Sequence, residues 1–317
     1  MACETIVIRK KKRQDAWRKL CWYIRRDKAF LLLSVLPVIY YFIFHYIPIY
    51  GILIAFVDYF PTRGVLGSPW VGLQWFRQFF DSYYFWRLLR NTLLLNVYGV
   101  IFAFPVPIIF AVLLNDISQV RFKKFVQTIS YMPHFISEVV IVGMLFTFFS
   151  ANSGVVNIIL NKLGYDTVQF MSQPGWFRPL YIGSNIWSSF GFSSIVYIAA
   201  ITGIDMELYD AASIDGATRF QKVLHITIPS IMPTIVTLLL LRLGNMMSVG
   251  YQKIVLMYSQ ATYETADVIS TFVYRSGIVS GNYGYATAVS LFNSIINLIL
   301  LVAFNKISRA VSDISLW

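Results

Sequence analysis

Histidine and cysteine, the residue types most often used as metal ligands or nucleophiles, are few in this chain and widely spaced. Histidine occurs only at His45, His134 and His225, and both cysteines, Cys3 and Cys21, lie near the amino terminus. These spacings match no metal-binding or nucleophilic motif. No stretch reads as the glycine-rich phosphate loop that ends in Gly-Lys-Ser or Gly-Lys-Thr. We therefore expect no catalytic residue, no metal site and no cofactor bound by this chain, so any nucleotide hydrolysis must take place on another chain.

Two charged residues lie inside apolar stretches, where a charged side chain is energetically costly. Glu138 and Arg242 each lie in a segment that could enter a membrane, where a charge costs at least about 2.5–3.5 kcal/mol unless it faces a cavity or a partner. Arg242 is expected to pair with a neighbouring permease subunit, with a place beside the substrate path or in a gate as the alternative. Glu138 is expected either beside the substrate path or in a gate, or near the lipid headgroups.

Composition indicates a membrane protein. Of the 317 residues, 57% are hydrophobic and 13% are charged, against about 25% charged in an ordinary soluble domain. Roughly 20 apolar residues in a helix cross about 30 Å of hydrocarbon, so runs of this size predict an all-α polytopic membrane protein with about six transmembrane helices. The expected spans are 29–55, 92–114, 135–149, 180–202, 226–246 and 286–304.

Basic residues predict the orientation and the division of the chain. With the amino terminus inside, 17 of the 26 Lys and Arg residues fall on the cytoplasmic side and 8 outside, which matches the retention of basic residues in the cytoplasm. Both termini are therefore expected there. The net charge of +11 is concentrated in a tail, since residues 1–28 hold 10 basic side chains. This placement favours membrane orientation over nucleic-acid binding.

Three regions are expected along the chain. Residues 1–28 form a basic cytoplasmic tail in which Trp17, Leu20, Cys21 and Ile24 share one apolar helix face, a pattern typical of a helix in the headgroup layer; a disordered tail is the alternative. A transmembrane domain follows over 29–310 and includes a cytoplasmic loop at 204–225. Residues 311–317 form a cytoplasmic carboxy-terminal tail.

The loop at 204–225 is too polar to lie in the membrane and too regular for a plain connector. Asp205 is expected to cap a short helix whose first turn contains Glu207, because acidic groups favour the amino-terminal end of a helix. Gly216 can adopt the left-handed conformation that ends such a helix. Ala211 and Ala212 leave a low surface for close approach by another backbone.

The same loop carries a family resemblance. It resembles the cytoplasmic signature of ABC importer permeases, Glu-Ala-Ala, three residues, Gly, nine residues and Ile-x-Leu-Pro. The matching residues here are Asp210, Ala211, Ala212, Gly216, Ile226, Ile228 and Pro229. Asp replaces Glu and Ile replaces Leu, which keeps charge and bulk.

Further similarity, over about residues 29–310, is to the binding-protein-dependent carbohydrate uptake permeases, above all their polysaccharide and oligosaccharide branch. It lies in 71–73, 75–76, 91–92, 267–269 and 274–275.

The resemblance implies the type I ABC importer transmembrane fold and a set of partners. These are a second permease expected to form a heterodimer with this chain, two ATP-binding cassette subunits that hold ATP and Mg²⁺, and an extracellular solute-binding protein. The cell membrane would be of the bacterial inner type. The short helix at 210–216 would rest on an ATPase, so the expected coupling residues are Asp210, Ala211, Ala212, Gly216, Ile226 and Pro229.

A sugar presents hydroxyl edges and C–H faces, which suit amides and flat aromatic rings. The candidate substrate-path residues are Glu138, Asn185, Trp187, Tyr197 and Asn245, and simple packing is the alternative for Trp187. Asn293 and Asn297 share one helix face, where they could bond a neighbouring helix or a substrate.

The leading interpretation is a permease subunit, not itself an enzyme, that imports an oligosaccharide or polysaccharide fragment. Import of a non-sugar solute such as a peptide stays open, because the loop signature reports coupling to an ATPase rather than cargo. A proton-coupled secondary carrier would need several buried acids or histidines, and only Glu138 fits that description. A membrane-bound enzyme would need catalytic groups clustered at one membrane face, which the sequence lacks.

Overall fold

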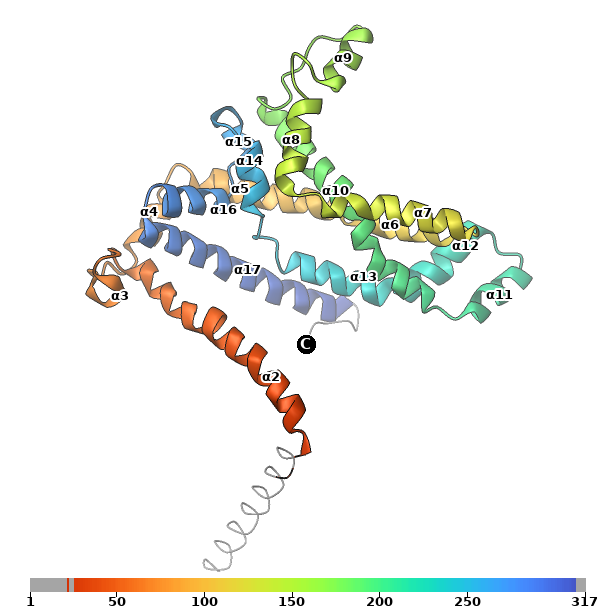
Figure 1. Cartoon of the computed structure of the whole chain (residues 1–317), viewed down its shortest axis with the longest axis horizontal. Coiled ribbons are helices and arrows are strands. Elements are labelled where there is room, and N and C mark those ends of the chain that lie inside the picture. The colour runs from red at the N-terminus through yellow and green to blue at the C-terminus, as the bar shows by residue number, and fades with distance from the viewer. Residues whose placement is uncertain (1–21, 23–25, 312–317) are drawn as a thin grey trace, which may run out of the picture. The chain divides into compact units, whose positions relative to one another are not determined.

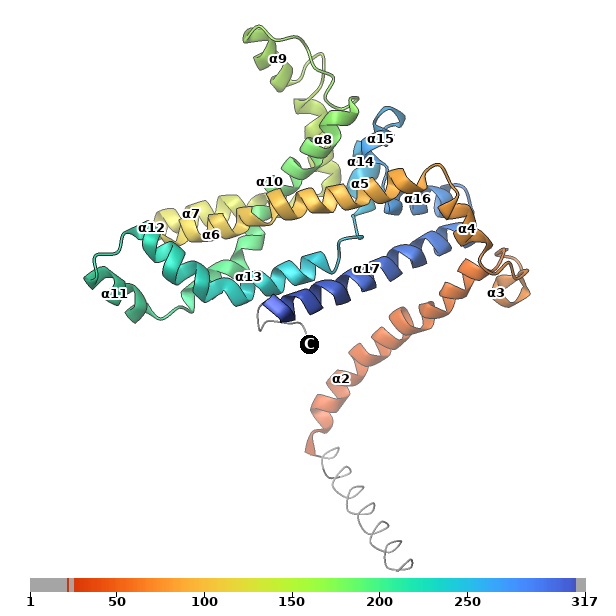
Figure 2. The same ribbon diagram turned by 180° about the vertical axis from the view of Figure 1, so that it is seen from behind.

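The structure is a computed structural model that describes Trp22 and residues 26–311 (Figures 1 and 2). The chain divides into two units, residues 1–54 and 55–317. The predicted headgroup helix in the tail at 1–28 and the tail at 311–317 lie outside the described residues, apart from Trp22, 26–28 and 311.

From Lys28 on, the described residues of the first unit lie in one long apolar helical stretch. Helix α2 (Lys28–Tyr41) continues through the π-helical segment Phe42–Tyr46 into the 3₁₀ segment Ile47–Phe56. Pro37 lies inside α2, where it removes one backbone donor without ending the helix. The whole stretch from Lys28 to Phe56 is long and apolar enough to cross a bilayer.

The second unit supplies the remaining candidate spans. Three more helical stretches of membrane-crossing length are Phe85–Asn115, Arg219–Leu243 and Tyr283–Ala310. Two bent pairs reach the same length and hydropathy, Val120–Phe135 with Glu138–Phe148 at 97° and Pro174–Thr202 with Met206–Ile214 at 70°. The described residues therefore hold four to six candidate spans, in the range of the about six that the sequence predicts.

Apart from one antiparallel bridge between Val57 and Trp70, the described residues of this unit form helices and loops. The helices are α3 (Gly64–Gly67), α4 (Gln74–Phe80), α5 (Phe85–Tyr98), α6 (Pro105–Asn115), α7 (Val120–Tyr131), α8 (Glu138–Phe148), α9 (Val155–Lys162), α10 (Pro174–Thr202), α11 (Met206–Ile214), α12 (Arg219–Lys222), α13 (Ile228–Leu243), α14 (Tyr251–Met257), α15 (Tyr263–Ala266), α16 (Ile269–Tyr274) and α17 (Tyr283–Val311). Shorter π-helical and 3₁₀ turns are Gly99–Ala103, Met132–Phe135, Val223–Thr227, Gln260–Thr262 and Arg275–Val279.

Close helix crossings hold the second unit together. Helix α10 packs along α6 and α13 through a buried cluster that includes Ala111, Tyr197 and Ile231. At Gly191, α10 passes so close to α7 that a Cβ atom would overlap the carbonyl of Ser130. Glycine is therefore required at this crossing for steric reasons.

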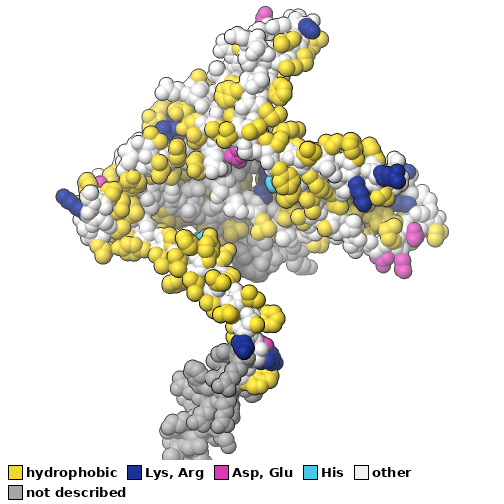
Figure 3. Space-filling view, viewed as in Figure 1, with side chains coloured by type: hydrophobic (Ala, Val, Ile, Leu, Met, Phe, Trp, Pro, Cys, Tyr) yellow, Lys and Arg dark blue, Asp and Glu magenta, His cyan; other side chains and the backbone are white. Residues whose placement is uncertain are grey.

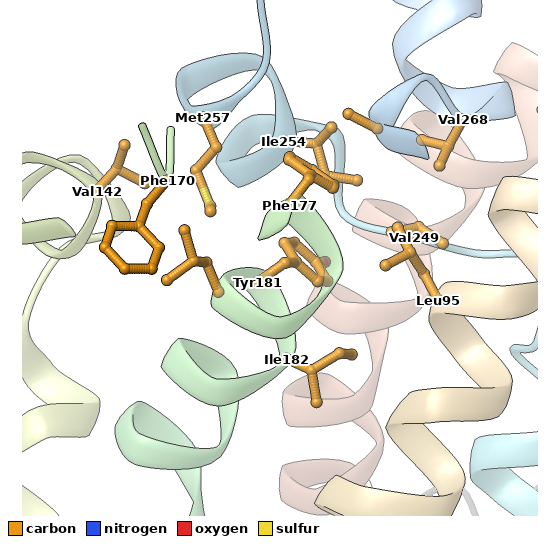
Figure 4. Close-up of a cluster of buried hydrophobic side chains, with 12 residues drawn as sticks. Leu95, Val142, Phe170, Phe177, Tyr181, Ile182, Val249, Ile254, Met257 and Val268 are labelled. Atoms are coloured by element: carbon orange, nitrogen blue, oxygen red, sulfur yellow. The ribbon is translucent and has the colours of Figure 1, made fainter. Parts of the chain in front are cut away.

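The largest buried cluster joins α10 to α14 and to the end of α5. Figure 4 shows Phe177 and Tyr181 of α10 close to Ile254 and Met257 of α14. Outside such clusters the helices expose apolar side chains over much of the visible surface, as a bilayer or a second membrane subunit requires (Figure 3). Charged side chains of both signs gather at the end that carries α11 and α12.

Candidate functional site

Helix α11 is a short capped helix that leaves α10 at 70°. The carboxylate of Asp205 accepts the backbone N–H of Glu207 at 3.0 Å, as predicted for the cap. At the other end, Gly216 has φ +76°, and the N–H groups of Gly216 and Ala217 donate to the carbonyls of Ser213 and Ala212. This pattern is a Schellman motif, which needs a residue that tolerates the left-handed region.

Two side-chain bonds tie α11 to the helix that follows. The Tyr209 hydroxyl lies 2.9 Å from Thr227 Oγ1, and Lys222 Nζ donates to Ser213 Oγ at 2.6 Å. Thr227 ends the π-helical turn that leads into α13. Movement of α11 would therefore reach the Arg219–Leu243 span directly.

The six predicted coupling residues fall into two groups. Asp210, Ala211 and Ala212 lie on α11, and Gly216 ends it. Ile226 lies in the π-helical turn, and Pro229 lies in the first turn of α13. An outward-facing apolar surface surrounds the first group, because Ile214 is 88% exposed and Phe220 is 72% exposed.

A second cluster lies between α8, α10 and α14. Lys253 Nζ donates to Asn185 Oδ1 at 2.6 Å and lies 5.5 Å from the centre of the Tyr181 ring. Lys253 is 3% exposed. Burial lowers its pKa from 10.5 to about 8, and the charge of Glu138 opposes that shift. The structure thus places Asn185, one of the predicted path residues, against a buried amine, and the charge of Glu138, another of them, acts on that amine from a longer range.

The other predicted path residues lie elsewhere. Tyr197 is buried in the packing cluster of α6, α10 and α13. Trp187 is 41% exposed and lines a cavity of about 440 Å³ between α8 and α10. Asn245 follows the end of α13 and donates to the carbonyl of Leu241 at 3.0 Å. The fifth span ends at Leu243, three residues before the end at 246 that the sequence predicts.

Asp267 is the centre of a buried polar network in the second unit. Its carboxylate is fully buried and accepts hydrogen bonds from Arg87 at 3.1 Å, Arg275 at 2.9 Å and the Thr271 hydroxyl at 3.0 Å. Burial alone would lower the pKa of Arg275, but the hydrogen bond and charge of Asp267 outweigh it and raise that pKa above its ordinary value. The backbone carbonyl of Asp267 accepts from Asn91 at 2.9 Å.

Asn91 extends this network to α10. Its amide nitrogen also donates to the carbonyl of Glu264 at 2.9 Å, and its amide oxygen accepts from Arg178 at 2.8 Å. The next residue, Thr92, accepts the backbone N–H of Ile269 at 3.0 Å. Asn91, Thr92, Asp267, Ile269 and Arg275, which lie in separate motifs of the sequence, therefore meet in one polar network between α5, α10 and α16.

Two parts of these sites are not apparent from the sequence. From the sequence, Lys253 is an ordinary loop lysine, and its only signal is its position ten residues after the end of α13 at Leu243. The partners of Asp267 lie up to 180 residues away in the chain, so no local pattern joins them.

The described residues form a multi-pass helical fold with a protruding capped helix, the architecture expected of a membrane permease. Residues 92–313 match the family described as "Binding-protein-dependent transport system inner membrane component". The chain belongs to this family. It is therefore a multi-pass inner-membrane protein and the permease component of an ABC importer, which confirms the interpretation from the loop signature over the proton-coupled carrier and the membrane-bound enzyme.

Relatives at high identity cover nearly the whole chain. The chain is 40% identical over 309 residues to the polygalacturonan/rhamnogalacturonan transport system permease protein YteP of Bacillus subtilis (strain 168), covering 97% of this chain and 95% of the relative. It is similar to a chain in the crystal structure of a bacterial ABC transporter involved in the import of the acidic polysaccharide alginate, with 43% identity, a TM-score of 0.86 and coverage of 93% and 99%.

A second crystal structure holds the bacterial alginate ABC transporter in complex with its alginate pentasaccharide-bound periplasmic protein. Its matching chain is 43% identical, with a TM-score of 0.85, and the match covers 92% of this chain and 98% of that one. Together these matches confirm the all-α importer permease fold expected from the sequence.

Proposed function

We propose that this permease imports an acidic polysaccharide or the oligosaccharides cut from one. The observation that carries the proposal is 43% identity, over 93% of the chain, to a component of an importer of the acidic polysaccharide alginate. The relative named for polygalacturonan transport supports it, because polygalacturonan is also a chain of uronic acid units. A carboxylate on each unit distinguishes such cargo from a neutral glycan.

We also propose the partners and the orientation. The chain pairs with a second permease in a heterodimer, with two ATP-binding cassette subunits that hold ATP and Mg²⁺, and with an extracellular solute-binding protein. The alginate transporter crystallised with its periplasmic protein supports the last of these. The excess of Lys and Arg on one side supports cytoplasmic termini, the tails at 1–28 and 311–317 and a transmembrane domain over 29–310.

In this proposal, α11 is the point where ATPase movement enters the chain. Asp210, Ala211, Ala212 and Gly216 form the part that docks, and Ile226 and Pro229 begin the span that receives the movement. The exposed apolar side chains around α11 support docking, and the bonds from Tyr209 and Lys222 support transmission into α13. Closing of the ATPase dimer would then tilt the spans toward the outward-open state.

The substrate path is proposed to pass Glu138, Asn185 and Asn245, with Trp187 as an aromatic contributor. Tyr197, which is buried between α6, α10 and α13, stays a prediction from the sequence. Lys253 adds a positive charge beside Asn185. Because a buried cation attracts carboxylates, this charge fits an acidic cargo better than a neutral one.

Transport by the assembled importer tests the cargo. The complex is reconstituted in vesicles with its binding protein, and uptake is measured for oligogalacturonides, for alginate oligosaccharides and for neutral glucose oligosaccharides of the same length. We expect ATP-dependent accumulation of an acidic oligosaccharide and none of the neutral ones. Accumulation of neutral glycans alone, or uptake in vesicles without ATPase subunits, would overturn the proposal.

A further inference from the structure

Helix α7 presents an outward face that combines basic and aromatic side chains. Arg121, Phe122, Lys124 and Phe125 are all exposed, the two phenylalanines by 50% and 60%. Residues three and four apart lie on the same side of a helix, so these four side chains of the first two turns share one broad face, called here the α7 basic face. The opposite side of α7, which carries Ser130, packs against α10.

The cations of this face have no counter-charge among the described residues. Within that part of the chain, no carboxylate lies within ion-pair distance of Arg121 or Lys124. Asp116, the acid that precedes them in the chain, pairs with Arg219 at 3.2 Å instead. The first turn of α7 holds no acidic residue, although cations near the amino-terminal end of a helix are unfavourable for it. These two charges therefore favour an anion that the described residues do not supply.

The preceding span sets the depth of this face in a bilayer. The helical stretch Phe85–Asn115 has 31 residues, which is about 46 Å at a rise of 1.5 Å per residue. A bilayer with its headgroup layers is about 40–45 Å thick. Trp86 near one end of the stretch is 74% exposed, as is typical of an aromatic residue at a membrane interface. The other end, and with it the beginning of α7, then lies in the opposite headgroup layer.

The α7 basic face also lies near the proposed coupling region. Figures 1 and 2 both place the beginning of α7 beside α12, and Figure 3 shows Lys and Arg side chains gathered at this end of the second unit. If α11 faces the ATPase, as proposed above, the face lies in the cytoplasmic leaflet. Anionic lipids give that leaflet a negative surface potential.

The chemistry of the face favours a lipid over a protein partner. A second permease that covered it would bury both cations, which is costly unless an acid pairs with each. A soluble ATPase would leave unused the exposed apolar side chains that continue along α7 to Ile129, which is 51% exposed. An anionic phospholipid suits both parts of the face, because it carries a phosphate and an acyl chain.

We propose that the α7 basic face binds an anionic phospholipid. The phosphate accepts hydrogen bonds from the Arg121 guanidinium and the Lys124 ammonium, and the acyl chain lies along Phe125 and Ile129. Long helical side chains lean toward the amino-terminal end of their helix, which directs both cations toward the headgroup layer. This lipid site depends neither on the nature of the cargo nor on which leaflet the face occupies.

Fluorescence quenching by spin-labelled lipid tests the site. Thr128 lies one turn beyond Lys124 on the same exposed side of α7. In the assembled transporter, freed of other cysteines by changes that include Cys3→Ser and Cys21→Ser, a bimane fluorophore is attached at Thr128→Cys. The complex is placed in phosphatidylcholine nanodiscs that contain a low fraction of either phosphatidylglycerol or phosphatidylcholine with a nitroxide on the acyl chain.

We expect the relative binding constant at this position to favour phosphatidylglycerol about fivefold. Added salt should weaken the preference, because salt screens exposed charges. The double variant Arg121→Gln, Lys124→Gln should quench equally with the two lipids. Arg77→Gln with Lys162→Gln is the matched control, since it removes the same charge from two exposed positions outside α7 and should keep the preference.

Each other result overturns the site. Equal quenching by the two lipids in the unsubstituted α7 would mean that only bulk lipid surrounds the face. Absence of quenching by either lipid would mean that the second permease or an ATPase covers it. A preference that survives Arg121→Gln, Lys124→Gln, or that is lost equally in the control pair, would show that these two cations do not bind the headgroup.

Discussion

Lys253 Nζ donates a hydrogen bond of 2.6 Å to Asn185 Oδ1 across 68 residues of sequence, and this bond joins α14 to α10. The amine is almost completely buried, and among the described residues no carboxylate lies within ion-pair distance of it. Its neighbours are the amide of Asn185, the Tyr181 ring and, at longer range, the charge of Glu138. A buried amine in such surroundings makes the stability of the fold depend on pH.

The first prediction concerns that dependence. Burial lowers the pKa of Lys253 to about 8 from an ordinary 10.5, with Glu138 opposing the shift. Between these values the unfolded chain holds a proton that the folded chain has released, so stability rises with pH from about 8 to 10.5. The rise amounts to about 3 kcal/mol. Lys253→Met should remove this component from the melting temperature of the detergent-purified transporter, measured across that range.

Lys162→Met provides the control, because Lys162 is an exposed lysine at the end of α9. It should leave the pH dependence as it is. A rise of the same size in Lys253→Met and in the unsubstituted protein would show that Lys253 is not its source.

The second prediction compares a buried with an exposed ion pair. Asp267 is fully buried between Arg87 and Arg275, and Asp267→Asn leaves those guanidinium groups without a counter-charge. We expect a loss of about 3–5 kcal/mol, seen as a large fall in melting temperature or in the yield of folded protein. Asp116→Asn breaks an exposed pair with Arg219, whose side chains are 55% and 84% exposed, and should cost about 0–1 kcal/mol. Equal effects in the two variants would contradict the assignment.

The polar network around Asp267 shows which contacts could be predicted from the sequence. Short motifs can be recognised at Asn91-Thr92, Asp267-Val268-Ile269 and Arg275, but their spacing in the chain does not predict that they are in contact. Their contacts depend on α5, α10 and α16 meeting in space, which is a property of tertiary packing. The membrane spans, in contrast, follow from the length and hydropathy of single segments, and the described residues hold four to six candidate spans where the sequence predicts about six.

The same division holds at α11. Asp205 and Gly216 could be assigned as its cap and its end from the sequence, because capping depends on residues within a few positions of each other. The surroundings of Tyr197 and Trp187 could not be predicted in this way. The Tyr197 ring is buried in a packing cluster, whereas the Trp187 ring lines a cavity. Which face of a membrane helix points inward is set by neighbouring helices, and an apolar helix with aromatics on several faces does not reveal it.

The third prediction concerns the crossing of α10 and α7. Gly191→Ala places a Cβ atom against the carbonyl of Ser130, which forces the two helices apart. We expect a loss of about 1–3 kcal/mol in thermal stability, as for other overpacked sites. Gly183→Ala, on the same helix with open space around it, should be neutral or gain up to about 1 kcal/mol from helix propensity. A stable Gly191→Ala variant would mean that the crossing is looser than described.

The last prediction concerns transmission through α11. Gly216 has φ +76° and open space around it, so a substitution there acts through backbone strain rather than through a clash. A β-branched residue in the left-handed region costs about 1–2 kcal/mol. Gly216→Val should therefore unwind the end of α11, and we expect transport and receptor-stimulated ATP hydrolysis in the assembled complex to fall together by about tenfold.

Gly216→Asn is the matched variant, because asparagine tolerates the left-handed region and adds a side chain of similar size. It should keep most of the coupling. The comparison separates backbone strain from side-chain bulk. Loss of coupling in both variants would mean that the ATPase contacts Gly216 itself and tolerates no side chain there. Loss of coupling in Gly216→Val alone would mean that coupling depends on the left-handed conformation that ends α11. Full coupling in Gly216→Val would contradict the transmission of ATPase movement through this helix.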